Sequence, residues 1–148
     1  MIELSDVTLT YPDGDSRITA VDRVSLTVRP GTVVGITGPS GSGKSSLLAI
    51  ASTLISADSG RVVVAGEDAT QLSLTGRARL RRERLGIVFQ QSNLLASLTA
   101  TDQLVLMGEI AGRRRDSAGR IAVTKKAAGL LAAVGLSCLL YTSPSPRD

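Results

Sequence analysis

The stretch "TVVGITGPSGSGKSSLLAI", residues 32–50, carries the strongest structural signal in the chain. Its first part, residues 32–37, is a short β-branched run that is typical of a strand inside a parallel sheet. Over residues 44–55 the apolar side chains recur at helical spacing, which predicts a helix. Between the two, "GPSGSGKS" at residues 38–45 matches the pattern G-x-x-x-x-G-K-[ST] in the strand-to-helix context that the pattern requires. The sequence therefore predicts a strand, a glycine-rich loop and a helix in direct succession.

The residue types in this loop suit the binding of a nucleoside triphosphate. Glycines let backbone N–H groups close around a β-phosphate, and the following helix points its unpaired N–H groups and its positive end at the same phosphate. Lys44 would supply a mobile charge for the β- and γ-phosphates, Ser45 a ligand for Mg²⁺, and Ser46 a donor to the α-phosphate. The alternative is an ordinary glycine-rich turn with a surface lysine. The predicted phosphate-binding residues are Gly38, Ser40, Gly41, Ser42, Gly43, Lys44, Ser45 and Ser46.

Composition restricts the remaining chemistry. The chain has 148 residues, of which 43% are apolar and only 2% aromatic, so its core would be built from aliphatic side chains. There is no histidine, which excludes imidazole as a metal ligand or general base. The single cysteine, Cys138, excludes an intrachain disulfide and a multi-cysteine zinc site.

Arginine clusters give the chain its net charge of +4. Such clusters are usually a solvated helix face, although they could also meet a phosphate backbone or an anionic membrane. The stacking aromatics that often accompany single-strand binding are missing around them, so no specific nucleic acid is expected as a partner. The clustered residues are Arg77, Arg79, Arg81, Arg82 and Arg84, followed by Arg113, Arg114 and Arg115.

Hydrophobic periodicity and turn residues predict the other elements. Residues 2–10 and 20–28 alternate apolar and polar side chains around the turn "PDGDS", which predicts an antiparallel hairpin. The apolar segment 127–141 is too short to span a membrane and is interpreted as a buried helix. We further expect strands at residues 61–66 and 86–89 and helices at 74–83, 101–111 and 120–134.

Several phrases together make the chain similar to a known family. The guanine-recognition pattern N-K-x-D is absent, which favours ATP over GTP. Tyr11, "GPSGSGKSS", "ADSGRVVVAGED" (residues 57–68) and "GIVFQQSNLLASLTATDQL" (residues 86–104) then follow one another in order. In these phrases the chain resembles the ATP-binding subunit of ABC transporters over residues 1–136. The last phrase looks most like exporters of the lipoprotein-release, macrolide-export and cell-division type.

The resemblance implies a fold and two further site residues. The fold would be α/β, a P-loop NTPase with a RecA-like core, an N-terminal antiparallel β subdomain and the start of a helical subdomain from about residue 92. Tyr11 would stack on adenine, unless it is merely a strand-end tyrosine half packed on the sheet. Gln90 would contact Mg²⁺ and the attacking water where a transmembrane partner docks. Its neighbour Gln91 is an equal candidate from the residues alone, and either glutamine could simply end a strand.

The resemblance also implies partners and a place in the cell. An ABC ATPase binds MgATP, with Lys44 and Gln90 as catalytic residues, forms a homodimer and drives transmembrane permease subunits from the cytoplasmic face of the membrane. The signature "LSGGQ", a Walker B Asp-Glu pair and a switch histidine are missing here. Residues 137–148 depart from the family pattern and, with two Ser-Pro pairs and no periodicity, are expected to be a disordered or foreign tail. We therefore expect an incomplete domain that binds nucleotide without hydrolysing it alone and that dissolves poorly because its strands 32–37 and 86–89 lack neighbours. A soluble non-transport ABC-type ATPase or a nucleotide sensor is the alternative function.

Overall fold

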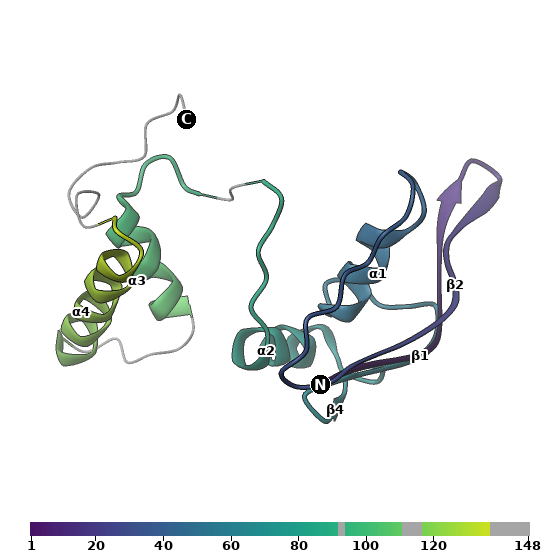
Figure 1. Ribbon diagram of the computed structural model, residues 1–148, viewed down its shortest axis with the longest axis horizontal. Helices are drawn as coiled ribbons and strands as arrows, with labels where there is room; N and C mark the ends of the chain where they lie inside the picture. The colour runs from purple at the N-terminus through teal and green to yellow at the C-terminus, as the bar shows by residue number, and fades with distance from the viewer. Residues whose placement is uncertain (92–93, 111–116, 137–148) are drawn as a thin grey trace. The chain divides into compact units, whose positions relative to one another are not determined.

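The computed structural model describes residues 1–91, 94–110 and 117–136 (Figure 1). The chain divides into two compact units, Met1–Ile87 and Val88–Asp148, and each is described by itself. Cys138, the arginines at 113–115 and the segment 137–148 that was expected to be a tail lie outside the described residues.

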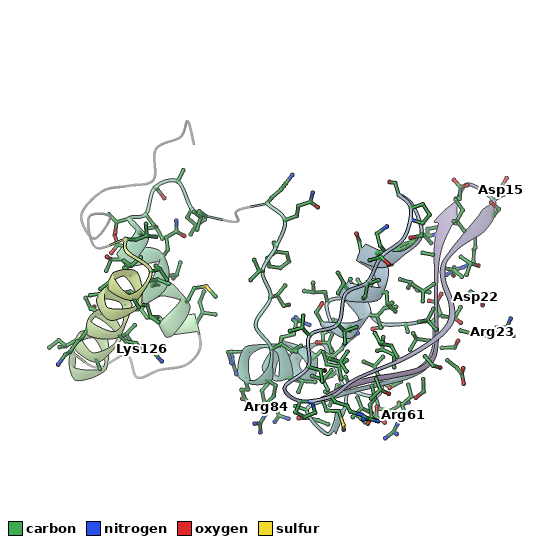
Figure 2. All side chains as sticks on the ribbon, viewed as in Figure 1. Asp15, Asp22, Arg23, Arg61, Arg84 and Lys126 are labelled. Atoms are coloured by element: carbon green, nitrogen blue, oxygen red, sulfur yellow. The ribbon has the colours of Figure 1, made fainter. Side chains whose placement is uncertain are left out.

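The first unit is built on an antiparallel sheet with strand order β2-β1-β3-β4. β1 (Ile2–Asp13) and β2 (Ser16–Val28) form the expected hairpin, with Gly14 and Asp15 at its tip (Figure 2). β3 (Ser59–Val64) pairs with the other edge of β1, and β4 (Glu67–Asp68) adds a short outer strand. The hairpin and the strand expected at residues 61–66 are confirmed, the latter two residues earlier.

An aliphatic core lies between this sheet and two helices. α1 (Lys44–Ala51) contributes Ile50, and α2 (Leu74–Arg84) contributes Leu80, both only 1% exposed. α1 contacts β1, β2 and β3, so the helix that follows the glycine-rich loop is attached to the sheet. Burial of these apolar side chains is the main favourable term for the unit. The sheet supplies Leu4, Val7, Leu9, Val21, Val62 and Val64 to the same cluster.

A bulge in β1 determines how closely β3 can approach. Asp6 has a φ of +48° at a register shift, and its backbone N–H donates to Ser25 Oγ at 3.0 Å. Gly60 of β3 lies directly against the bulge, where a Cβ would come within 2.5 Å of the Asp6 carbonyl oxygen and 2.6 Å of the Val7 Cα. Since Gly60 also has a φ of +92°, only glycine satisfies this close approach without distortion.

Two expected strands are wrong. Residues 32–37 and 86–89 are not strands in the structure, and each run exposes its valines, with Val33 fully exposed and Val88 98% exposed. The physical reason is pairing, because no described strand lies in register beside either run to complete a hydrogen-bonded ladder. The α/β class is confirmed by the sheet together with its helices.

The second unit contains a pair of helices, α3 (Ala100–Ile110) and α4 (Ser117–Ala133). The expected helices at 101–111 and 120–134 are therefore confirmed to within a few residues. The buried helix expected at residues 127–141 falls partly on α4: Ala127 and Leu131 are buried while Leu130 is 50% exposed, so one face is buried there. Residues 137–141 lie outside the described residues. In the described residues no helix is long and apolar enough to cross a membrane.

Candidate phosphate-binding site

The site is centred on the turn that leads into α1. Gly43 is the N-cap of the helix with a φ of +80°, and a Cβ at this position would lie 2.0 Å from the carbonyl oxygen of Ala20 in β2. A residue with a side chain would therefore push the start of α1 away from the hairpin. Gly43 fixes the loop against the sheet at its helical end.

The first turn of α1 provides free backbone donors. The first intrahelical hydrogen bond runs from the Leu47 N–H to the Gly43 carbonyl at 2.8 Å. The N–H groups of Lys44, Ser45 and Ser46 lie within the first turn, where a helix offers no carbonyl partner. No acidic residue occupies this turn, so the positive end of the helix is not neutralised locally. Donors and dipole together suit an anion.

The Lys44 ammonium is held over the loop by the backbone of the loop itself. Its Nζ donates to the Gly38 carbonyl at 2.9 Å, to the Pro39 carbonyl and to Ser42 Oγ at 3.2 Å. These acceptors are exposed and neutral, so a more strongly charged acceptor could replace them. The Lys44 ammonium therefore adds a second source of positive charge beside the free N–H groups of the helix.

Serine hydroxyls surround the space in front of the helix. A cavity of about 360 Å³ opens there, which lies within the range of small-ligand pockets. Hydroxyls and backbone N–H groups can bind phosphate oxygens, and a hydroxyl can also ligate Mg²⁺. The lining residues are Ala20, Ser40, Gly41, Ser42, Gly43, Lys44, Ser45 and Ser46, so seven consecutive residues of the predicted loop and helix start meet in one place.

Tyr11, predicted from a distant part of the sequence, reaches the same place. It lies near the end of β1, and its hydroxyl is 3.4 Å from Ser46 Oγ. The side chain is 42% exposed, so the ring is not committed to the core. The structure therefore brings Tyr11 to the first turn of α1, beside the predicted phosphate-binding residues.

Sequence reasoning missed a polar cluster next to Tyr11. The Thr10 N–H and Oγ1 both donate to Asp58 Oδ2, at 2.8 and 2.7 Å, and Arg17 Nε donates to Thr10 Oγ1 at 2.7 Å. The hydrogen bonds from Thr10, with the nearby Arg17 charge, hold the pKa of Asp58 below its usual value. Asp58 stood within the family phrase "ADSGRVVVAGED", but its partner lies 48 residues away and no local pattern marks the pair.

Gln90 is not brought to this site by the described contacts. Gln90 and Gln91 are exposed residues of the second unit, so a role for either beside the loop stays a prediction. The described residues contain no cluster of three or more carboxylate or cysteine side chains that could hold a metal ion.

The arginine cluster around α2 has structural partners. Three of its arginines bond to groups of their own unit: Arg77 to Ser56, Arg79 to Glu67 and Arg81 to the Thr53 carbonyl. Arg82 and Arg84 are exposed. Most of this positive charge is therefore engaged in holding α2 and the turn after α1 in place.

Known proteins are similar to this chain over most of its length. The family model of the ABC transporter matches residues 21–146. The lipoprotein-releasing system ATP-binding protein LolD of Granulibacter bethesdensis is 42% identical, over 91% of this chain and 57% of that protein. The methionine import ATP-binding protein MetN of Streptomyces griseus is 45% identical, over 93% of this chain and 38% of that protein. The macrolide export ATP-binding/permease protein MacB of Hyphomonas neptunium is 40% identical, over 97% of this chain and 22% of that protein. The chain thus spans 22% to 57% of the length of these curated relatives.

A solved structure agrees with these relatives. A dimeric, post-hydrolysis state of the ATP-binding cassette MJ0796, bound to ADP and Pi, matches all of this chain and 63% of that chain with a TM-score of 0.88 and 32% identity. The same relationship therefore appears in the family model, in the curated sequences and in the backbone, and each includes the loop and α1. The chain belongs to the family of ABC transporter ATP-binding proteins.

Proposed function

We propose that this chain binds MgATP at the loop of residues 38–46 and is the nucleotide-binding part of a membrane transporter. The observation that carries the proposal is the cavity in front of α1, where free N–H donors, serine hydroxyls and the Lys44 ammonium converge. Such a convergence of donors at a helix N-terminus suits an anion with several oxygens, such as a polyphosphate.

Each residue then has a distinct task. The N–H groups of Gly41, Gly43 and Lys44 would surround the β-phosphate, and Lys44 would exchange its carbonyl acceptors for β- and γ-phosphate oxygens. Ser46 would donate to the α-phosphate. Tyr11, whose hydroxyl already lies 3.4 Å from Ser46, would stack its ring on the adenine base. Gly38, Ser40 and Ser42 would complete the loop around the phosphates.

The donor set fits Mg²⁺ bound together with the nucleotide. Ser45 offers an exposed hydroxyl oxygen beside the cavity, and the family resemblance adds the Gln90 amide oxygen as a second ligand in this proposal. Mg²⁺ typically takes few protein ligands and keeps phosphate oxygens and waters. When bound, the ion would neutralise phosphate charge. In this proposal the residues of the loop and of the first turn of α1 hold the phosphates.

The partners in this proposal follow from the family. The relatives are named as import and export ATP-binding proteins, and the matching cassette is a dimer. We propose that the whole protein forms a homodimer that hydrolyses ATP and drives transmembrane permease subunits from the cytoplasmic face of the membrane. For these 148 residues, which contain no "LSGGQ" and no Walker B Asp-Glu pair, the proposal is nucleotide binding.

Replacement of Lys44 tests the proposal. Titration of the chain with a fluorescent ATP analogue should give saturable binding, and Lys44→Ala should weaken it at least about tenfold because charge-assisted contacts to phosphate are lost. Lys126→Ala, an exposed residue of α4, is the control and should bind like the original chain. Equal affinity in the Lys44 and Lys126 variants would overturn the assignment of the loop.

Co-purification with membrane proteins separates the transporter from its alternative. If the full-length protein emerges from detergent extracts with a permease, the transporter function is supported. If it is recovered alone from the soluble fraction and still binds ATP, a non-transport ATPase or nucleotide sensor is the better description.

A further inference from the structure

Thr10, the residue before Tyr11, has all of its polar groups occupied. Its N–H and Oγ1 donate to Asp58 Oδ2, and its Oγ1 also accepts a hydrogen bond from Arg17 Nε. Its carbonyl accepts from Arg17 Nη2 at 3.4 Å. Because the backbone of Thr10 is held on both sides of its Cα, the direction in which the chain presents Tyr11 is fixed as well.

Asp58 connects this strand to the segment that follows α1. Its own N–H donates to the Thr8 carbonyl at 2.8 Å, one position beyond the pairing of Thr8 with Ser59. The Asp58 carboxylate accepts a hydrogen bond from the Thr10 N–H, at a position where the β1–β3 ladder has ended. β1 is therefore attached to the first turn of α1 through Tyr11 and Ser46, and to the segment after α1 through Thr10 and Asp58.

The cluster is exposed, which argues against a purely structural role. The side chains of Arg17 and Asp58 are 60% and 44% exposed, and their ion pair is 3.5 Å long. Exposed pairs of this kind contribute little to the stability of a fold. Their effect is on geometry, because four hydrogen bonds from Asp58 and Arg17 converge on Thr10, the residue that precedes Tyr11.

We infer that Asp58, together with Arg17, is a positioning residue for Tyr11. By fixing Thr10, Asp58 holds the tyrosine ring at the first turn of α1, where it is available to a nucleotide base. The inference rests on the proposed function, and it adds that recognition of the base depends on a carboxylate that touches no part of the nucleotide.

Comparing two ligands tests the inference. Calorimetric titration of the chain with MgATP and with inorganic tripolyphosphate separates recognition of the base from recognition of the phosphates. Asp58→Ala should weaken ATP binding about three- to tenfold, a part of what one stacked base contributes, and leave tripolyphosphate affinity unchanged. Arg17→Gln should act in the same direction, more weakly, because the Thr10–Asp58 hydrogen bonds persist.

The matched control lies at the other edge of the sheet. Asp68 is also an exposed carboxylate bonded to an arginine and a threonine, with Arg61 Nε at 2.7 Å and the Thr70 N–H at 3.0 Å. Asp68→Ala should change neither affinity. A double variant with Tyr11→Ala completes the design, since Asp58→Ala should have no further effect on ATP binding once the ring has been removed.

The outcomes distinguish this inference from the proposed function. If the original chain binds neither ligand, the proposed function fails. If it binds ATP and the Asp58 and Arg17 variants bind it equally well, the inference fails and the function stands. Equal losses for ATP and tripolyphosphate, or an additive effect with Tyr11→Ala, would show that Asp58 acts on the loop as a whole and would also overturn the inference. Should Asp58→Ala fail to fold, Arg17→Gln decides.

Discussion

β1 and residues 32–37 are both predicted as strands from the sequence, and only β1 is a strand in the structure. β1 pairs with β2 on one side and β3 on the other, while residues 32–37 pair with no described strand. Val7 of β1 is fully buried and Val33 is fully exposed. The comparison shows that a β-branched run becomes a strand only when other segments complete its hydrogen-bonded ladder.

The two ends of the phosphate-binding loop differ in the same way, because only one of them is attached to the paired sheet. Its helical end is attached to the sheet by Gly43 against Ala20 and by the first hydrogen bond of α1. Its other end continues from residues 32–37, which have no ladder. The donors that matter for an anion come from the attached end, so the site can be formed without the preceding strand.

The largest expected effect comes from separating β3 from β1. Gly60→Ala places a Cβ within 2.5 Å of the Asp6 carbonyl at a φ of +92°, so both a backbone clash and strain arise. We expect a loss of about 3 kcal/mol or more in the free energy of unfolding, measured by urea denaturation. Gly66→Ala is the matched control, because its φ is +85° and no atom lies within 4 Å of the added Cβ. It should cost about 1 kcal/mol, and equal losses in the two variants would refute the close approach.

The next effect compares the two runs directly. Val7→Ala removes methyl groups from the core and should lower the free energy of unfolding by about 2 kcal/mol. Val33→Ala makes a similar chemical change at a fully exposed position and should stay within about 0.5 kcal/mol of the original. A large loss for Val33→Ala would mean that residues 32–37 are packed in solution, and the contrast between the runs would disappear.

Sequence reasoning succeeded where the signal is local. The hairpin turn at Gly14 and the apolar spacing of α1 and α2 predicted elements that the structure contains. It failed at residues 32–37 and 86–89, because propensity carries no information on which strand will lie alongside. It also missed the contacts of Asp58 with Thr10 and of Gly60 with Asp6, which depend on a register shift in β1 and join residues about fifty positions apart.

For the site, the sequence predicted the loop residues from one contiguous motif that contains them all. The cavity that gathers Ser40 to Ser46 shows that these neighbours in sequence are also neighbours in space. Tyr11 was found only through the family resemblance, and the structure places its hydroxyl near Ser46. Gln90 belongs to the other unit, and its role stays a prediction.

A smaller effect tests how firmly the attached end of the site is held. Arg81 donates to the Thr53 carbonyl in the turn after α1, and Thr53 is only 2% exposed. Arg81→Ala should cost about 1.5 kcal/mol in the free energy of unfolding, since a buried acceptor loses a charged donor. Arg82→Ala, at an exposed neighbouring position, should change it by less than about 0.5 kcal/mol. Similar losses in both would indicate a general effect of charge on α2 rather than this hydrogen bond.

The smallest effect lies at the outer edge of the paired sheet, where Asp68 of β4 bonds to Arg61 of β3 (Figure 2 labels Arg61). The hydrogen bonds from Arg61 and Thr70 lower the pKa of Asp68 from 3.8 to about 2. A carboxylate whose pKa is lowered by folding stabilises the folded state at any pH above the pKa that it has in the unfolded chain. This contribution is lost as the pH falls from about 4 through about 2. The stability difference between the original chain and Asp68→Asn should therefore be small and constant above pH 5 and should shrink toward pH 2. A difference that persists unchanged at pH 2 would mean that it does not come from the ionised carboxylate of Asp68, and would contradict a role for its charge in attaching β4 to β3.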